Sequence, residues 1–207
     1  NTNDAMAAAS LANMVVEDNY FGGSAPLCGG TPWTETSSAG AFCSYFNMGD
    51  SALSFVRRNR FANFNITNTN TGTGVPGSWN AIQYIGGKLN IDSNTIGSEV
   101  DTNSIFISGA NGNIVYPIAS TSGSAGSFRI RGNTISGIRV SGSGTTAFNI
   151  YSIHISGASS TVTYDVEYNN IGLLPIKVLS STSTTAQVNI GINCASSANL
   201  NIKNNFI

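Results

Sequence analysis

The stretch Phe128-Arg-Ile-Arg-Gly-Asn-Thr-Ile-Ser-Gly137 decides the fold of this chain, because its pattern returns along the whole sequence. The pattern is apolar-x-apolar-x-x-Asn-x-apolar, and six copies of it occur. Their asparagines are Asn19, Asn59, Asn94, Asn133, Asn169 and Asn205, spaced 40, 35, 39, 36 and 36 residues apart. Repetition at such a period is typical of a solenoid, in which a repeat buries its apolar face only against its neighbours.

The residues before each asparagine alternate as the residues of a β-strand do. The positions five and three residues before it are apolar and mostly β-branched or aromatic, with Ser54 as the one polar exception. Other strand-like runs and turns rich in Gly, Ser and Thr lie between the copies. Each repeat is therefore predicted to hold two or three strands, and the repeats are predicted to stack into an all-β solenoid.

A charged residue stands two positions before every one of these asparagines, and its sign alternates along the chain. The members of this charge column are Glu17, Arg57, Asp92, Arg131, Glu167 and Lys203. Only 9% of the chain is charged, so six hits at one register are not chance. Opposite charges on neighbouring strands attract, so the column is predicted to fix the register of stacked coils. Two further pairs on adjacent coils are Asp18 with Arg58 and Arg129 with Asp165.

Each asparagine follows a strand at the place where the chain must bend. Its amide can bond the backbone of its own turn and the same amide of the next coil, so that buried groups are satisfied. The sequence therefore predicts an asparagine ladder of six rungs. The alternative is a set of surface turn residues that never meet, since turns favour Asn in any case.

The repeats Phe128–Gly137 and Leu89-Asn-Ile-Asp-Ser-Asn-Thr-Ile-Gly97 resemble coils of right-handed parallel β-helices of the pectin-lyase-like superfamily. They are similar to the Asn-Thr-Ile repeats of secreted or cell-surface proteins of gliding Bacteroidetes-type bacteria. The resemblance covers roughly residues 14–207 and implies a right-handed parallel β-helix of about six coils, with 35–40 residues per coil. It indicates little about activity, because that superfamily includes lyases, hydrolases, esterases, phage tailspikes, adhesins and structural stalks.

Composition excludes several classes of partner. The chain has 26 Asn and 23 Gly, which suit turns and strands, and a net charge of −1 without any run of like charges. We therefore expect neither nucleic-acid binding nor insertion into a membrane, for which no apolar run is long enough. The composition and the resemblance together predict an extracellular or cell-surface location.

The 207 residues are expected to form a single β-helix domain with special features at its ends. Residues 1–13 are a candidate N-terminal cap, with Asp4 and Ala5–Leu11 forming a short helix or another strand. Residues 22–47 are predicted to be a loop insert, with a disulfide between Cys28 and Cys43. The copy Leu200–Ile207 has no cap, so either further chain or another subunit is expected to cover that end.

Few charged residues remain as candidates for binding or catalysis once those assigned to pairs between coils are set aside. Glu99 and Asp101 share one loop and are a weak candidate site for calcium, the alternative being solvated loop charges. Arg129, Arg131 and Asp165 are a candidate catalytic or anionic-sugar cluster. Exposed aromatic rings could stack on glycans, and the candidates are Trp33, Trp79, Tyr84, Tyr116 and Tyr151. No zinc site, nucleophile elbow or cofactor motif is found.

The sequence therefore favours a non-catalytic extracellular segment of a surface stalk, adhesin or filament, without cofactor or metal. Its expected partners are copies of itself, stacked head to tail, or further repeats of a longer chain. Glycans are a second candidate partner. The alternative function is a β-helix that binds or degrades polysaccharides as a lyase or hydrolase.

Overall fold

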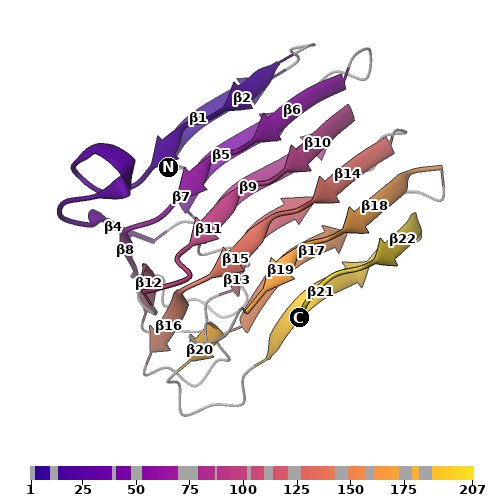
Figure 1. Ribbon diagram of the computed structural model, residues 1–207. Helices are drawn as coiled ribbons and strands as arrows, with labels where there is room; N and C mark the ends of the chain where they lie inside the picture. Colours follow the sequence, from indigo (N-terminus) through magenta and orange to yellow (C-terminus); the bar gives the residue numbers. More distant parts are fainter. Residues whose placement is uncertain are drawn as a thin grey trace.

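The computed structural model describes residues 3–9, 14–38, 41–47, 53–69, 79–86, 88–101, 104–109, 114–120, 127–142, 149–156, 161–172, 179–181 and 188–207. These segments form a parallel β-solenoid of four sheets, in which successive strands of each sheet come from successive coils (Figure 1). The all-β solenoid predicted from the repeat is confirmed.

Two sheets carry six strands and two carry five. Sheet 1 comprises β1 (Asn3–Ala9), β5 (Ala41–Asn47), β9 (Trp79–Gly86), β13 (Ile114–Ser120), β17 (Asn149–Ser156) and β21 (Asn189–Ala195). Sheet 2 comprises β2 (Val15–Glu17), β6 (Leu53–Arg57), β10 (Lys88–Asp92), β14 (Ser127–Arg131), β18 (Thr163–Glu167) and β22 (Asn199–Lys203). Sheet 3 comprises β3 (Tyr20–Phe21), β7 (Arg60–Phe61), β11 (Thr95–Gly97), β15 (Thr134–Ser136) and β19 (Asn170–Ile171). Sheet 4 comprises β4 (Trp33–Ser37), β8 (Phe64–Asn68), β12 (Ile105–Gly109), β16 (Ile138–Gly142) and β20 (Leu179–Ser181).

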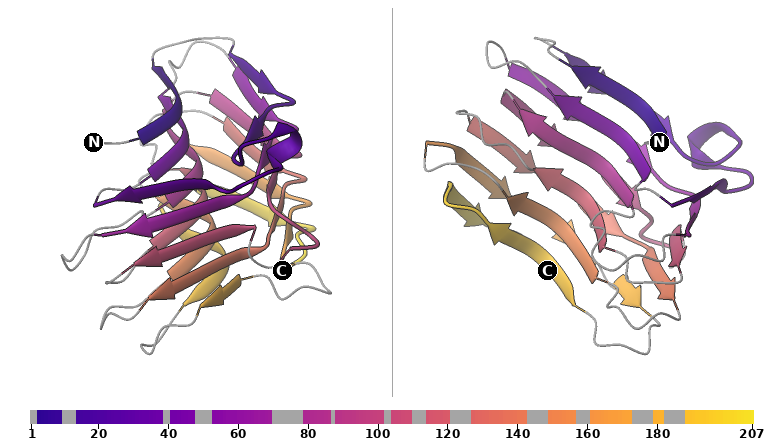
Figure 2. Two further views of the ribbon diagram at one scale, coloured as in Figure 1. Left: turned by 90° about the vertical axis from the view of Figure 1, so that its left-hand side faces the viewer. Right: turned by 180° about the vertical axis from the view of Figure 1, so that it is seen from behind.

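One coil therefore contains four strands, whereas two or three were predicted. The sequence missed some of them because a strand of only two residues cannot show a period of two. Five coils carry a strand in every sheet, and the sixth carries β21 and β22. Figure 2 shows the coils following one another along one axis from the N-terminal end in indigo to the C-terminal end in yellow.

The repeats stack in the register that the asparagine spacing predicts. Ile91, three residues before Asn94, pairs with Val56 in the preceding coil and with Ile130 in the following one. These inward positions are buried within one continuous apolar core, to which sheets 1 and 4 add Trp79, Ile107 and others. Ser54 is buried among them, and its Oγ accepts a hydrogen bond from the Met14 N–H at 3.1 Å. That bond explains how a polar residue is tolerated there.

Of the two alternatives predicted for the N-terminal segment, the strand is confirmed and the helix is wrong. Residues 3–9 form β1, because pairing with β5 overrides the helix propensity of the alanines. The predicted loop insert is wrong as well. Residues 22–47 are not one loop. They contain the three-residue 3₁₀ turn η1 (Pro26–Cys28) and two strands, of which β5 extends sheet 1 and β4 extends sheet 4. Residues 10–13, at the end of the candidate cap, lie outside the described part of the chain.

Candidate functional site

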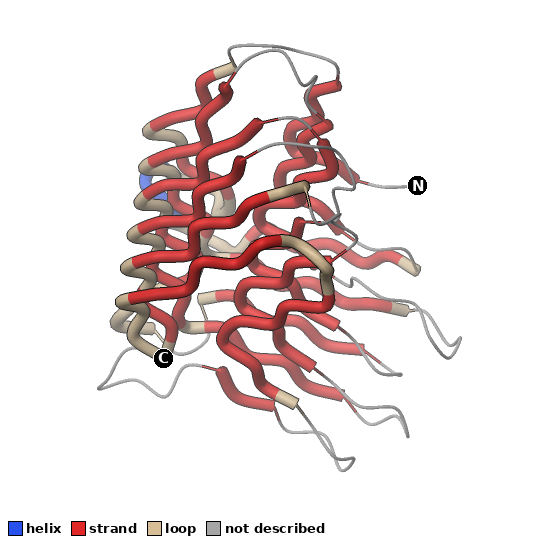
Figure 3. Tube along the Cα trace, turned by 90° about the vertical axis from the view of Figure 1, so that its right-hand side faces the viewer, coloured by secondary structure: helices blue, strands red, loops and turns tan. Residues whose placement is uncertain are grey.

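The corner between sheets 2 and 3 is built in the same way in every coil, and the corners form one column along the solenoid (Figure 3). The residue before each asparagine has a positive φ, which reverses the chain between the two strands. These residues are Asp18 (58°), Arg58 (55°), Ser93 (56°), Gly132 (63°), Tyr168 (55°) and Asn204 (55°). Most side chains avoid this left-handed conformation, so the corners at Arg58, Ser93 and Tyr168 store a small backbone strain that the stacked neighbours must stabilise.

The asparagines form the predicted ladder, and Asn133 shows its bonding. Its Nδ2 donates to the Ile91 carbonyl oxygen at 2.9 Å and to Asn169 Oδ1 at 3.0 Å. Its own Oδ1 accepts from the Asn94 backbone N–H at 2.9 Å and from Asn94 Nδ2 at 3.0 Å. Asn59, Asn94 and Asn169 repeat these contacts and are buried. The ladder therefore satisfies buried backbone groups that the corners leave without strand partners.

The ladder has a direction, because every rung donates to the Oδ1 of the rung that follows it. Asn19 at the first rung donates from its N–H and Nδ2 to Asn59 Oδ1, at 3.1 and 3.0 Å. Asn205 at the last rung accepts from Asn169 and donates from Nδ2 to the Val166 carbonyl oxygen at 2.8 Å. The first rung thus presents the Asn19 Oδ1 atom as an acceptor at one end of the ladder. The last rung presents the Asn205 backbone N–H as a donor at the other end.

The corner geometry predicts that Ser93→Gly stabilises the chain. Ser93 is exposed and has a φ of 56°, which glycine adopts without strain. We expect a gain of about 0.5 kcal/mol in the free energy of unfolding, since relief of strain exceeds the added entropy of the unfolded chain. The matched reverse change, Gly132→Ala, is expected to cost a similar amount, because the added Cβ would meet nothing closer than Ser93 Oγ at 3.4 Å. Urea unfolding of both variants checks this, and a loss of stability in Ser93→Gly would contradict it.

All six members of the charge column lie side by side on successive strands, as predicted, but ion pairs within the column form only at its two ends. Arg57 Nε lies 2.6 Å from Glu17 Oε2, and Lys203 Nζ lies 3.0 Å from Glu167 Oε1. Asp92, however, accepts two hydrogen bonds from Arg129, at 2.6 and 3.1 Å, instead of pairing within its own column. A diagonal neighbour on the next strand lies within reach of the long arginine side chain. The Arg131 guanidinium lies 5.1 Å from the centre of the Tyr168 ring.

The two additional pairs predicted from sequence have different outcomes. Arg58 binds Asp18 through two hydrogen bonds of 2.9 and 2.8 Å, as predicted, and also reaches Glu17 Oε2 at 2.9 Å. Arg129 binds Asp92 instead of Asp165, whose carboxylate accepts from Asn201 Nδ2 at 3.0 Å. The predicted cluster of Arg129, Arg131 and Asp165 is therefore divided among stacking contacts.

These contacts shift the pKa values of the groups at both ends of the column. The pKa of Glu17 is lowered mainly by its hydrogen bond from Arg57, and that of Asp18 by its hydrogen bond from Arg58. The pKa of Lys203 is raised by the hydrogen bond to Glu167. These shifts keep Glu17, Asp18 and Lys203 charged at neutral pH. Because the paired groups are exposed, each pair adds little to stability, and its main effect is expected on register.

The remaining predicted residues do not gather into a site. Glu99 and Asp101 are exposed in the turn after β11, and the described residues contain no group of three or more carboxylate, Cys or His ligands. Cys28 is a buried free thiol whose Sγ lies 3.3 Å from the Phe21 carbonyl oxygen, so the predicted disulfide with Cys43 is wrong. Burial raises the pKa of the Cys28 thiol.

The aromatic candidates for glycan stacking are only partly exposed. Trp79 and Tyr84 are core residues, which corrects the prediction that they lie on the outside. Tyr116 and Tyr151 are half-buried, and their ring centres lie 5.7 Å apart, so they pack against each other. Trp33 is exposed, as predicted, although its ring also packs against Phe64 with 5.6 Å between ring centres. The rings therefore serve mainly the packing between coils.

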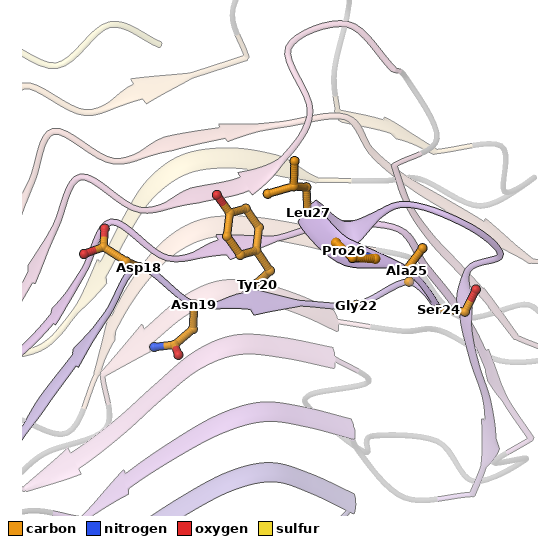
Figure 4. Close-up of a pocket in the computed structure, with 9 residues that line it drawn as sticks. Asp18, Asn19, Tyr20, Gly22, Ser24, Ala25, Pro26 and Leu27 are labelled. Atoms are coloured by element: carbon orange, nitrogen blue, oxygen red, sulfur yellow. The ribbon is translucent and has the colours of Figure 1, made fainter.

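Two grooves on the surface of the described residues involve sheet 2 or its corner with sheet 3. The larger, of about 600 Å³, borders the first rung and is lined by Asp18–Tyr20, Gly22 and Gly23 on one side and Ser24–Leu27 on the other (Figure 4). The smaller, of about 380 Å³, crosses the outer face of sheet 2 and is lined by Leu53, Lys88, Asn90, Phe128, Arg129 and Asp165. Sequence reasoning found neither groove, because both depend on how loops and long side chains lie over neighbouring coils.

Comparison of the chain with protein-family models, curated proteins and solved structures found no match in any of the three. The fold and the site themselves define the class of this chain, which is a parallel β-solenoid with a buried asparagine ladder. Among the described residues the only helix is η1, which is far too short to cross a membrane.

Proposed function

We propose that this chain is a non-catalytic structural or adhesive segment of an extracellular stalk, adhesin or filament. The observation that supports this best is the asparagine ladder, whose amides use their hydrogen bonds to join one coil to the next. Ion pairs between side chains of sheet 2 add a second set of contacts between coils.

A structural segment should resist force and should yield one coil at a time. In a solenoid each repeat contacts only its neighbours, so coils can detach in sequence. Pulling the chain by its two ends in single-molecule force spectroscopy is therefore expected to give a series of steps. A coil of 35–40 residues should lengthen the chain by about 120–140 Å per step, at about 3.5 Å per residue. Unfolding in one low-force event would contradict a load-carrying role.

The alternative function, binding or cleavage of a polysaccharide, is favoured by one observation. The groove on sheet 2 brings the Lys88 ammonium, the Arg129 guanidinium and the Asp165 carboxylate to one exposed surface. Such a surface could hold an acidic sugar unit through charge-assisted hydrogen bonds.

A panel of neutral and acidic polysaccharides separates the two functions. A purely structural stalk or filament segment is expected to give no new reducing ends, no unsaturated products and no saturable binding. If binding or cleavage is found, the groove is responsible only when Arg129→Ala abolishes it while Arg131→Ala does not. Arg131 is the matched control, since it lies on the same strand and face but does not line the groove.

A further inference from the structure

The two ends of the asparagine ladder are chemically complementary. Among the described residues nothing donates to Asn19 Oδ1, which is the position that accepts from the preceding rung everywhere else in the ladder. At the other end, the Asn205 backbone N–H occupies the position that donates to the following rung. The end with Asn205 therefore offers the backbone donor that the end with Asn19 lacks.

The charges at the two ends are complementary as well. Glu17 begins the charge column and Lys203 ends it. Within the chain, a lysine and a glutamate at this position of adjacent coils already form an ion pair, between Lys203 Nζ and Glu167 Oε1 at 3.0 Å. Placing Glu17 of another copy on the open side of Lys203 would repeat the same contact, whereas joining two like ends would oppose like charges.

Shape and apolar surface agree with this pairing. The last coil exposes Ile202 (46%), Phe206 (53%) and Ile207 (70%), and the first exposes Val15 (49%) and Tyr20 (53%). The groove at the first rung is lined by Asn19 and Tyr20 and by the turn Ser24–Leu27 (Figure 4).

We propose that a second copy of this chain stacks head to tail on the first, with Asn205 of one copy on Asn19 of the next. Asn205 N–H and Nδ2 donate to Asn19 Oδ1, Asn19 Nδ2 donates to the Ile202 carbonyl oxygen, and Tyr20 N–H donates to the Asn205 carbonyl oxygen. These are the contacts that Asn169 and Asn205 make within the chain.

The joint also extends two sheets, because β21 meets β1 in sheet 1 and β22 meets β2 in sheet 2. A heterologous contact that does not close produces a filament. The inference rests on the proposed structural function and names the partner of its open faces.

Charge reversal at the two ends tests the joint. The variants are Lys203→Glu and Glu17→Lys, each first checked for retained β structure by circular dichroism. Either variant alone opposes like charges at every joint between its own copies. In an equimolar mixture each joint can again pair Lys with Glu, because the head of one variant matches the tail of the other. Sedimentation velocity and electron microscopy from about 1 to about 100 µM, a range where micromolar association is visible, give the readout.

The wild-type chain is expected to form concentration-dependent linear oligomers. Each variant alone should require at least about tenfold higher concentration to do so, and the mixture should recover the wild-type behaviour. A wild-type chain that stays monomeric throughout the range overturns the proposal, whatever the variants do. So do variants that assemble as well as the wild type, or a mixture that fails to recover.

These outcomes are separate from those of the polysaccharide panel. A monomeric chain without polysaccharide activity would leave the structural function standing and remove only the second copy as partner.

Discussion

Replacing Asn133 by leucine is expected to lower the free energy of unfolding by about 3–6 kcal/mol, since three buried polar groups lose their partners. Asn133 is fully buried, and leucine has the same number of side-chain heavy atoms but a larger volume, so no cavity opens and the loss reports the broken hydrogen bonds together with crowding by the larger side chain. The groups left unsatisfied are the Asn94 backbone N–H, one Asn94 Nδ2 proton and the Ile91 carbonyl oxygen. No water can reach them inside the stack without opening it.

Asn19→Leu is the matched control for this change. Asn19 belongs to the same ladder but lies at its exposed end, where water can replace the lost bonds. Its replacement should cost less than about 1 kcal/mol. Urea unfolding followed by circular dichroism measures both variants, with equal m-values as the check that the same transition is compared. Equal losses at the two sites would mean that the buried ladder does not hold the coils together.

Gly97→Ala is expected to cost about 3 kcal/mol or more, or to prevent folding of the central coils, because of a steric clash between coils. Gly97 has a φ of +88°, and a Cβ built there would lie 1.5 Å from the Ser136 carbonyl oxygen, which is backbone and cannot move aside. The clash would separate β11 from β15, which pair directly through Gly97 and Ser136. The loss should therefore extend to neighbouring coils.

Gly172→Ala separates the steric effect from the conformational one. Gly172 is the equivalent corner residue three positions after Asn169 and has a φ of +73°, but a Cβ there would meet nothing within 4 Å. Only the strain of a positive φ remains, which costs about 1 kcal/mol. Thermal and urea unfolding of the two variants give the comparison. A Gly97→Ala variant as stable as Gly172→Ala would refute the close approach of the coils at Ser136.

The inward face of sheet 2 and the register of the coils could be predicted because both follow from simple periods. Strand side chains alternate with a period of two, and stacked coils bring equivalent residues together. Ile91 and Ile130 were therefore identified as core residues from spacing alone. The strands of sheet 3 could not be predicted, since a pair such as Arg60–Phe61 is too short to show alternation.

The conformation of the corner could not be predicted either. The residue before each asparagine is held at positive φ by its place between two paired strands, whatever its side chain. Gly132, Asn204 and Asp18 among the six are residue types that tolerate this region, while Arg58 and Tyr168 adopt it against their own preference. A tertiary constraint of this kind leaves no mark in the composition of the turn.

The wrong predictions near the N-terminal end share one cause. Local signals in Ala5–Ala9 favour a helix, and the Gly and Pro residues around Cys28 favour a loop, but both segments join existing sheets or pack on them. The edge of a stacked coil offers a complete row of backbone partners, and this outweighs a weak local preference. The pairing of Asp92 with Arg129 likewise depends on side-chain reach, which a column of charges in the sequence does not contain.

Hydrogen exchange of asparagine side chains tests the central claim most directly, because the ladder is the feature that joins the coils. In an NMR experiment in D2O, the Nδ2 protons of Asn59, Asn94, Asn133 and Asn169 should persist long after those of exposed asparagines have exchanged. These four side chains are 0–1% exposed and bonded on both sides, so their exchange should require opening of the stack. The first-rung amide of Asn19 should exchange much faster. Rapid exchange at all four internal rungs would contradict a ladder that holds the solenoid together.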